Sequence, residues 1–189
     1  MIQKIYLHQF EVNGMEQVLK HYSIFGTMTI RNAEEKDLPL ILEIMNEAIE
    51  NTTAIYDYYP RNNDYVKTWF AQKQSDSLPV LVCELNNQAV AYGTYGSFRE
   101  RTAYKFSIEH SIYVHKNFQG KGIGKVLMKS LISAATEGGY HTMIAGIDAS
   151  NEKSCAFHRQ FGFEEVGRIK EVGFKFDRWL DLVFMQLLL

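Results

Sequence analysis

A short strand, a glycine-dense turn and a helix follow one another in residues 107–131, and this unit constrains the fold most strongly. β-branched and aromatic residues around Ile112 and Tyr113 indicate the strand. Apolar residues that recur at three- and four-residue spacing from Val126 indicate the helix. Between them, residues 119–124 read Gln-Gly-Lys-Gly-Ile-Gly, which lets the backbone approach a ligand closely. Unpaired amides and the positive end of the helix dipole then favour a bound phosphate.

The spacing of the glycines narrows the kind of phosphate ligand. A Walker loop needs four residues between its first glycine and its Gly-Lys pair, and no register of this turn supplies them. A dinucleotide fingerprint needs two residues between its last two glycines, and only Ile123 lies there. The turn therefore serves another phosphate ligand, or it simply joins a strand to a helix.

Composition excludes several other classes of protein. With 189 residues, 46% of them hydrophobic and 22% charged, the chain predicts one globular domain. A net charge of −2 without a long Lys/Arg run argues against nucleic acid as a partner. No apolar stretch reaches the ~20 residues of a membrane span. Cys83 and Cys155 lie far apart, without the spacing of metal ligands, which favours reduced thiols and a cytoplasmic location.

The order of predicted elements describes a mixed α/β sheet. Strands are expected at 29–31, 79–85, 88–98, 107–114, 143–147, 163–174 and 179–188, and helices at 38–49, 64–74 and 151–161. A further helix, marked by Val126, Leu127 and Leu131, follows the glycine turn and is ended by Gly138 and Gly139. Asn86 and Asn87 favour a tight hairpin turn. Residues 28–189 are predicted to form the domain, and residues 1–27 an N-terminal extension or leader.

The strand, turn and helix resemble the Q/R-x-x-G-x-G/A motif of the GCN5-related N-acetyltransferases, in which the loop cradles the pyrophosphate of acetyl-CoA. Three further stretches resemble the phosphinothricin acetyltransferases, namely 107–114, 145–151 and 171–181, and the last carries a G-F-K-x-x-x-W pattern. The resemblance implies the GNAT fold in a single domain. It also implies acetyl-CoA as cosubstrate, no metal, and a homodimer.

The activity that this resemblance implies is acetylation of the amine of a small amino acid analogue. Phosphinothricin, methionine sulfoximine and methionine sulfone are the expected acceptors, by direct attack in a ternary complex, with a role in antibiotic or herbicide resistance. Two alternatives stay open. One is an acetyltransferase for polyamines or protein N-termini, and the other is a non-catalytic module that binds acetyl-CoA.

The resemblance also implies which residues contact the cofactor. They lie on the strand, in the turn and at the start of a later helix: Ile112, Tyr113, Val114, Gln119, Gly120, Lys121, Gly122, Ile123, Gly124, Lys125, Asn151 and Ser154. Backbone amides near Tyr113 and Val114 would hold the oxyanion of the tetrahedral intermediate. For Asn151 and Ser154, plain capping of the helix is an alternative role.

Glu109 and His158 are the expected catalytic residues. The amine attacks only as the free base, and Glu109, on the strand that leads to the turn, is the candidate to take its proton. His158 stands where most members of the superfamily have a tyrosine, and a histidine works as an acid or a base near neutral pH. The sequence leaves open which of the two takes the first proton. It also leaves open that Glu109 is only an exposed carboxylate on the strand and that His158 is only a structural histidine of the helix.

Five residues are expected at the acceptor amine: Tyr56, Arg99, Arg101, Tyr104 and Phe174. Guanidinium groups suit carboxylate and phosphinate oxygens, although either arginine also fits a surface charge. The tyrosine-rich segment 51–63 fits either a lid over a small pocket or a cover over the core. Phe174 and Trp179 also fit a contact with a second subunit.

Overall fold

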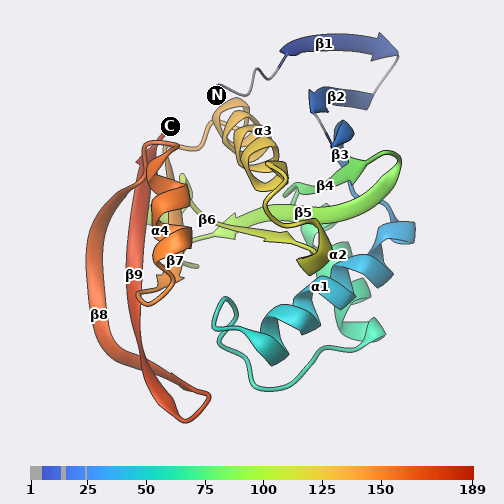
Figure 1. Cartoon of the computed structure of the whole chain (residues 1–189). Helices are drawn as coiled ribbons and strands as arrows, with labels where there is room; N and C mark the ends of the chain where they lie inside the picture. The colour runs from blue at the N-terminus through green and yellow to red at the C-terminus, as the bar shows by residue number, and fades with distance from the viewer. Residues whose placement is uncertain (1–5, 14–15, 24) are drawn as a thin grey trace, which may run out of the picture. The chain divides into compact units, whose positions relative to one another are not determined.

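The computed structural model describes residues 6–13, 16–23 and 25–189, and Figure 1 shows their order along the chain. The strands are β1 (Tyr6–Asn13), β2 (Glu16–Ser23), β3 (Gly26–Asn32), β4 (Val80–Leu85), β5 (Gln88–Ser97), β6 (Ser107–Val114), β7 (Thr142–Asp148), β8 (Glu164–Lys175) and β9 (Arg178–Leu188). The α-helices are α1 (Leu38–Asn51), α2 (Asn63–Ser75), α3 (Ile123–Glu137) and α4 (Glu152–Arg159). Short 3₁₀ turns span η1 (Glu35–Asp37), η2 (Thr102–Tyr104) and η3 (Lys116–Phe118). The predicted order of elements from residue 28 onward is confirmed.

The chain divides into two compact units, each assembled from separate segments. The first takes its described residues from 1–44, 62–94 and 112–131, and the second consists of 45–61, 95–111 and 132–189. Strands β5 and β6 and helices α1 and α3 each contribute residues to both units. Because neither unit is one continuous stretch of sequence, the two units are parts of a single domain.

The first unit is built on an antiparallel sheet in the order β1-β2-β3-β4-β5. Ile30 on β3 faces Cys83 on β4, and both side chains are buried. Asn86 and Asn87 join β4 to β5 with φ angles of 53° and 65°, as expected for a tight hairpin. The apolar face of this sheet therefore forms the core of the unit.

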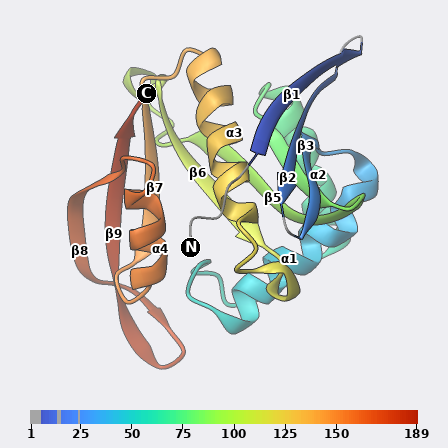
Figure 2. The same cartoon turned by 45° about the horizontal axis from the view of Figure 1, so that its top comes forward.

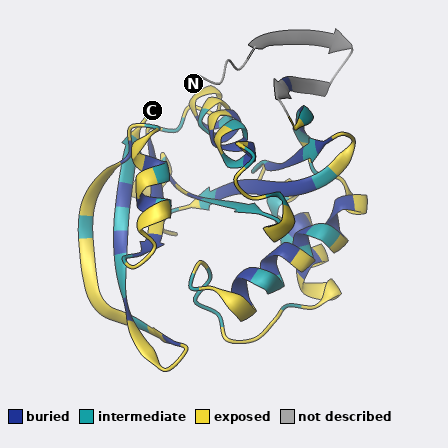
Figure 3. Cartoon of the chain, in the orientation of Figure 1, coloured by how far each residue is buried: buried dark blue, intermediate teal, exposed yellow. Residues whose placement is uncertain are grey.

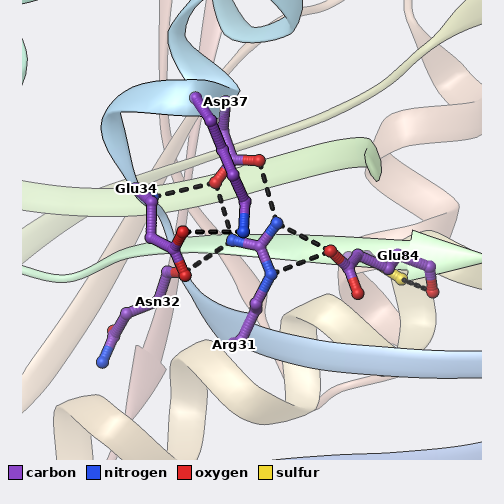
Figure 4. A network of polar contacts seen from close by, with 7 residues as sticks. Arg31, Asn32, Glu34, Asp37 and Glu84 are labelled. Atoms are coloured by element: carbon purple, nitrogen blue, oxygen red, sulfur yellow. Dashed lines mark hydrogen bonds and ion pairs between the residues drawn. The ribbon is translucent and has the colours of Figure 1, made fainter. Parts of the chain in front are cut away.

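Arg31 holds three elements of the first unit together (Figure 4). Its guanidinium donates two hydrogen bonds to Asp37 in η1, at 2.6 and 2.9 Å, and two to Glu84 on β4, at 2.9 and 2.7 Å. The Asp37 carboxylate also accepts a bond from the Glu34 backbone N–H at 2.8 Å. Asp37 thus ties the start of α1 to β3.

The second unit orders its strands β6-β7-β9-β8. β6 runs parallel to β7 over Ser107–Glu109, whereas β7 and β9, and β9 and β8, are antiparallel. β7 is almost wholly buried, while β8 is exposed along most of its length (Figure 3). β8 and β9 form a long two-stranded ribbon (Figure 2), which turns at Phe176 and Asp177 with positive φ angles.

The start of β3 and the end of α4 differ from the boundaries predicted from the sequence. Strand β3 begins at Gly26, so the predicted start at residue 28 falls inside it, and β2 pairs with β3 from Leu19↔Ile30 to Ser23↔Gly26. The status of residues 1–27 as an extension stays a prediction, and residues 1–5, 14, 15 and 24 lie outside the described part. Helix α4 ends at Arg159, before the expected Phe161, because a turn to Gly162 at φ 87° follows.

Candidate active site

The turn before α3 keeps its backbone open. Gly120 and Gly122 have φ angles of 76° and 82°, a region that other residues rarely adopt. A Cβ atom placed on either glycine would meet no atom within 4 Å. Within the described residues, the backbone N–H groups of positions 120–124 donate to no acceptor, while Gly122 O accepts bonds from the amides of Lys125 and Val126 at 3.0 and 3.3 Å. A row of free amides at a helix N-terminus is the arrangement that an anionic group needs.

The residues around this turn are held by local contacts of the first unit. The Gln119 side-chain amide donates to Val114 O at 3.3 Å. The Lys121 ammonium lies 4.7 Å from the centre of the Phe118 ring. Tyr113, half-buried at the end of β6, packs its ring 5.4 Å from that of Tyr92. The predicted cofactor residues on strand and turn are therefore brought together, and their role in binding stays a prediction.

Glu109 lies in the second unit, beside a glycine of the neighbouring strand. Its Oε1 is only 2.9 Å from where a Cβ atom of Gly146 would stand. Within the described residues the carboxylate makes no hydrogen bond or ion pair, and Glu109 is exposed to solvent. Surrounding protein atoms nevertheless desolvate it and raise its pKa above the usual 4.5, and the charge of Arg99 opposes that rise. A free carboxylate with a raised pKa suits a proton acceptor.

His158 is buried, and both of its ring nitrogens are engaged. Nδ1 lies 2.7 Å from the Ser154 backbone carbonyl, and Nε2 lies 3.2 Å from Nε2 of His110. Because a carbonyl only accepts, Nδ1 of His158 carries the proton, and its Nε2 accepts a bond from the Nε2–H of His110. Nδ1 of His110 is then an acceptor, and it is buried without a partner among the described residues.

The histidine pair stays uncharged near neutral pH. Burial, and in second place the neighbouring His158, lower the pKa of His110 to about 3. Burial also lowers the pKa of His158, although its bond to Ser154 opposes this. His110 was not among the residues predicted from the sequence. Strict alternation in the strand, which sets Glu109 outward, is the signal that points His110 inward with Ile108, and both are buried.

Asn151 and Ser154 cap helix α4. The Asn151 side chain accepts a bond from the Ser154 N–H at 3.0 Å, as in an ordinary N-cap. The Ser154 hydroxyl lies 3.5 Å from Nδ1 of His158. Capping, the alternative role, is thus present, and contact with the cofactor stays a prediction for both residues.

The residues expected at the acceptor form two groups of the second unit. In one, the Arg99 guanidinium lies 4.7 Å from the centre of the Phe98 ring, and the Tyr104 ring lies 6.1 Å from the same ring. Arg101 is exposed and immediately precedes η2, as its N-cap residue. In the other group, Tyr56 lies against Gly173, next to Phe174. Among these five residues, it is the charge of Arg99 that acts on Glu109, where it lowers the pKa of the carboxyl group.

The described residues form neither a metal-binding cluster nor a membrane-spanning helix. They hold no group of three or more His, Cys, Asp or Glu side chains that could bind a metal ion. In the same part of the chain, no helix combines the length and apolar character required to cross a membrane.

Comparison with known proteins identifies the family. Residues 30–184 match the acetyltransferase (GNAT) domain. The L-methionine sulfoximine/L-methionine sulfone acetyltransferase of Salmonella typhimurium is 41% identical over 160 residues, which cover 85% of this chain and 94% of that protein.

Two solved structures resemble the whole domain. A ribosomal-protein-alanine N-acetyltransferase from Brucella melitensis has a TM-score of 0.83 at 47% identity, covering 85% of this chain and 99% of that one. A phosphinothricin acetyltransferase from Sinorhizobium meliloti in complex with AcCoA has a TM-score of 0.83 at 38% identity, covering 86% and 88%. The chain therefore belongs to the GNAT acetyltransferases, in the family of the methionine sulfoximine and phosphinothricin acetyltransferases.

Proposed function

We propose that this enzyme transfers the acetyl group of acetyl-CoA to the amine of a small amino acid analogue such as methionine sulfoximine, methionine sulfone or phosphinothricin. The observation that carries the proposal is the 41% identity, over 160 residues, to an acetyltransferase named for methionine sulfoximine and methionine sulfone. The open amides of positions 120–124 support the cofactor part, because they can accept a diphosphate.

Glu109 is proposed to take the first proton. Its carboxylate makes no bond within the described residues, whereas both ring nitrogens of His158 are engaged. The acceptor ammonium gives a proton to Glu109, and the free amine then attacks the thioester carbonyl. A C–N bond forms and the C–S bond breaks. The attacking nitrogen then loses its second proton, and this proton is taken up by the leaving thiolate, so the products are the amide and the free thiol of the coenzyme. Backbone amides near Tyr113 and Val114 are proposed to stabilise the oxyanion.

His158 is proposed to support the site through its bonds to Ser154 and His110 rather than by touching the thiolate. A neutral pair whose hydrogen bonds point into the interior is a poor proton donor. The alternative is that His158 acts directly as a general acid. Substitution of His110 and of His158, one at a time, distinguishes the two roles.

A thiol-release assay tests the activity. The purified enzyme is given acetyl-CoA with methionine sulfoximine, methionine sulfone, phosphinothricin, a polyamine or a peptide that begins with alanine. The peptide is included because a structure at 47% identity is titled a ribosomal-protein-alanine N-acetyltransferase. Release with the small analogues alone supports the proposal. Release only with the peptide or polyamine assigns the enzyme to that acceptor, and binding of acetyl-CoA without release with any amine indicates a non-catalytic module.

A homodimer, a cytoplasmic location and a role in resistance form part of the proposal. Exposed apolar side chains follow the β8–β9 ribbon, which supports a second subunit there: Val166, Ile169, Val172, Phe174, Phe176 and Trp179. Two buried free cysteines agree with a reducing compartment. Sedimentation velocity tests the dimer, and growth of an expressing host on phosphinothricin tests resistance.

A further inference from the structure

The loop between α1 and α2 is fastened to the end of β8 by a buried lysine. Lys175 is only 3% exposed, and its ammonium donates to three backbone carbonyls, Ile49 O at 2.5 Å, Thr52 O at 2.8 Å and Ile55 O at 2.6 Å. An ammonium has three N–H donors, so all of them are used. One of the carbonyls belongs to the last turn of α1, where carbonyls lack helical partners and attract a cation. The Lys175 ammonium therefore caps the C-terminal end of α1 and binds the first part of the loop that follows.

Burial of the Lys175 ammonium carries a free-energy cost, because the charge is removed from water. Burial lowers the pKa of Lys175, and the nearby Asp57 opposes this only in part. A charge removed from water is tolerated where its hydrogen bonds are complete, as they are here. The Lys175 ammonium therefore holds the loop at residues 52–61. We name this loop the tyrosine loop, after Tyr56, Tyr58 and Tyr59.

The two residues before Lys175 contact the same loop. A Cβ atom on Gly173 would lie 2.7 Å from Cε2 and 2.8 Å from Cδ2 of the Tyr56 ring, so only a glycine leaves room for that ring. The Tyr58 hydroxyl donates to the Phe174 carbonyl at 2.5 Å. Three consecutive residues of β8 thus hold the tyrosine loop by three different contacts.

Other bonds fix the rest of the loop. The Thr53 hydroxyl donates to the Asp148 carboxylate at the end of β7. At the far end, the Asn46 side chain bonds both the N–H and the carbonyl of Arg61, at 2.7 and 3.0 Å. Within this fastened loop, the Tyr56 hydroxyl is buried and has no hydrogen-bond partner among the described residues. A buried hydroxyl without a partner is unfavourable unless a ligand supplies one.

We propose that Gly173, Phe174 and Lys175 position the tyrosine loop so that the Tyr56 hydroxyl donates to an acidic oxygen of the acceptor. Lys175 is a positioning residue, and Tyr56 contacts the substrate. This inference rests on the proposed acetylation of small amino acid analogues, because their carboxylate, sulfoximine and phosphinate oxygens are the acceptors that such a donor suits.

The first test displaces the Tyr56 ring without touching the lysine. Gly173→Ala places a methyl group where it collides with the Tyr56 ring. Gly167→Ala on the same strand is the matched control, because a Cβ there meets no atom within 4 Å. We expect the KM for methionine sulfoximine to rise roughly tenfold in Gly173→Ala, since a small misplacement of a positioning group weakens binding strongly. The KM for acetyl-CoA should stay at the wild-type value, and Tyr56→Phe should raise the KM for the acceptor to a similar extent.

The second test removes the anchor. Lys175→Met leaves three carbonyls without their donor, and Lys170→Met, an exposed lysine on the same strand, is the control. Chymotrypsin should cut Lys175→Met after the exposed Tyr58 several times faster than the control, while the KM for the acceptor rises. If this variant does not fold, the acceptor KM of Gly173→Ala and of Tyr56→Phe still tests the proposal.

The outcomes separate this inference from the proposed function. If the wild-type enzyme acetylates no small analogue, the proposed function fails before any variant is compared. If the wild-type enzyme is active and Gly173→Ala and Tyr56→Phe both keep the acceptor KM of Gly167→Ala, the positioning role is overturned. An equal rise in the KM for acetyl-CoA would also overturn it, because the change would then be a general loss of structure.

Discussion

Replacement of Arg31 by methionine tests how far one buried guanidinium stabilises the first unit. The Arg31 side chain is 13% exposed, and its partners Asp37 and Glu84 are 4% and 18% exposed. Methionine keeps much of the length and apolar contact of the side chain but leaves both carboxylates without a counter-charge. Removal of one partner from a buried ion pair costs about 3–5 kcal/mol, mostly as the penalty of the charges left behind.

The expected change in free energy of unfolding lies at the lower end of that range. Glu84 keeps some solvent, and the Glu34 amide still bonds Asp37, so a loss of about 3 kcal/mol is expected. For a protein of this size, each kcal/mol lowers Tm by roughly 2–4 °C, which predicts a fall of roughly 6–12 °C. Differential scanning calorimetry of the purified protein measures it.

The control is the neighbouring surface ion pair. Lys36 and Glu34 are 64% and 48% exposed, so Lys36→Met should change stability by less than about 1 kcal/mol. An Arg31→Met protein whose Tm lies within about 2 °C of wild type would refute the reasoning, since the guanidinium would then contribute no more than a surface charge.

Acid provides an independent check on the same residues. Burial alone would raise the pKa of Asp37, but the bonds from Arg31 and from the Glu34 amide outweigh it and lower that pKa below 3.8. Because the folded pKa is the lower one, the stabilisation is fully present above the unfolded value near pH 3.8 and is lost as the pH falls through the folded value. Below pH 3.8, the stability of wild type should therefore fall toward that of Arg31→Met.

Three other predictions concern the candidate site. Glu109→Gln should lower turnover by roughly 10²–10⁴-fold and leave the KM for acetyl-CoA near wild type. Steady-state kinetics should also find the acidic limb of the wild-type pH profile above 4.5, since burial raises the Glu109 pKa, and an unchanged profile in the variant would contradict this. Gly122→Ala imposes a φ of 82° on alanine, so urea unfolding should show a loss of about 1–2 kcal/mol, and calorimetry should show weaker binding of coenzyme A than in Gly167→Ala. His110→Phe leaves Nε2 of buried His158 without its donor and should cost about 1–3 kcal/mol, with turnover at pH 7 nearly kept. A loss of turnover as large as that of Glu109→Gln would instead show that the pair carries the proton.

Local patterns in the sequence are enough to predict most of the element order. Glycines end helix α3 and the turn after α4, and alternating or β-branched runs mark the strands, because these signals depend on neighbours along the chain. The open turn at positions 120–124 is likewise a local property, and its free amides follow from glycine geometry. The family resemblance is confirmed by the match over residues 30–184.

Such local patterns could not predict interactions between residues that are far apart in the sequence. His110 and His158 are 48 positions apart, and only the packing of α4 against β6 brings their Nε2 atoms to 3.2 Å. Lys175 stands in an exposed ribbon, where a lysine is expected to reach water, yet it binds carbonyls more than 100 positions earlier in the chain. Burial of a charge depends on tertiary partners, which one-dimensional periodicity does not carry.

The glycine beside the proposed base has a consequence for reading related genomes. Gly146 leaves the space that the Glu109 carboxylate occupies, since a methyl group there would come within 2.9 Å of an oxygen. A homologue that keeps the glutamate but carries a larger residue opposite it should hold that carboxylate elsewhere. Read together in related genes, this pair of positions predicts whether the glutamate side chain can take the orientation that it has here.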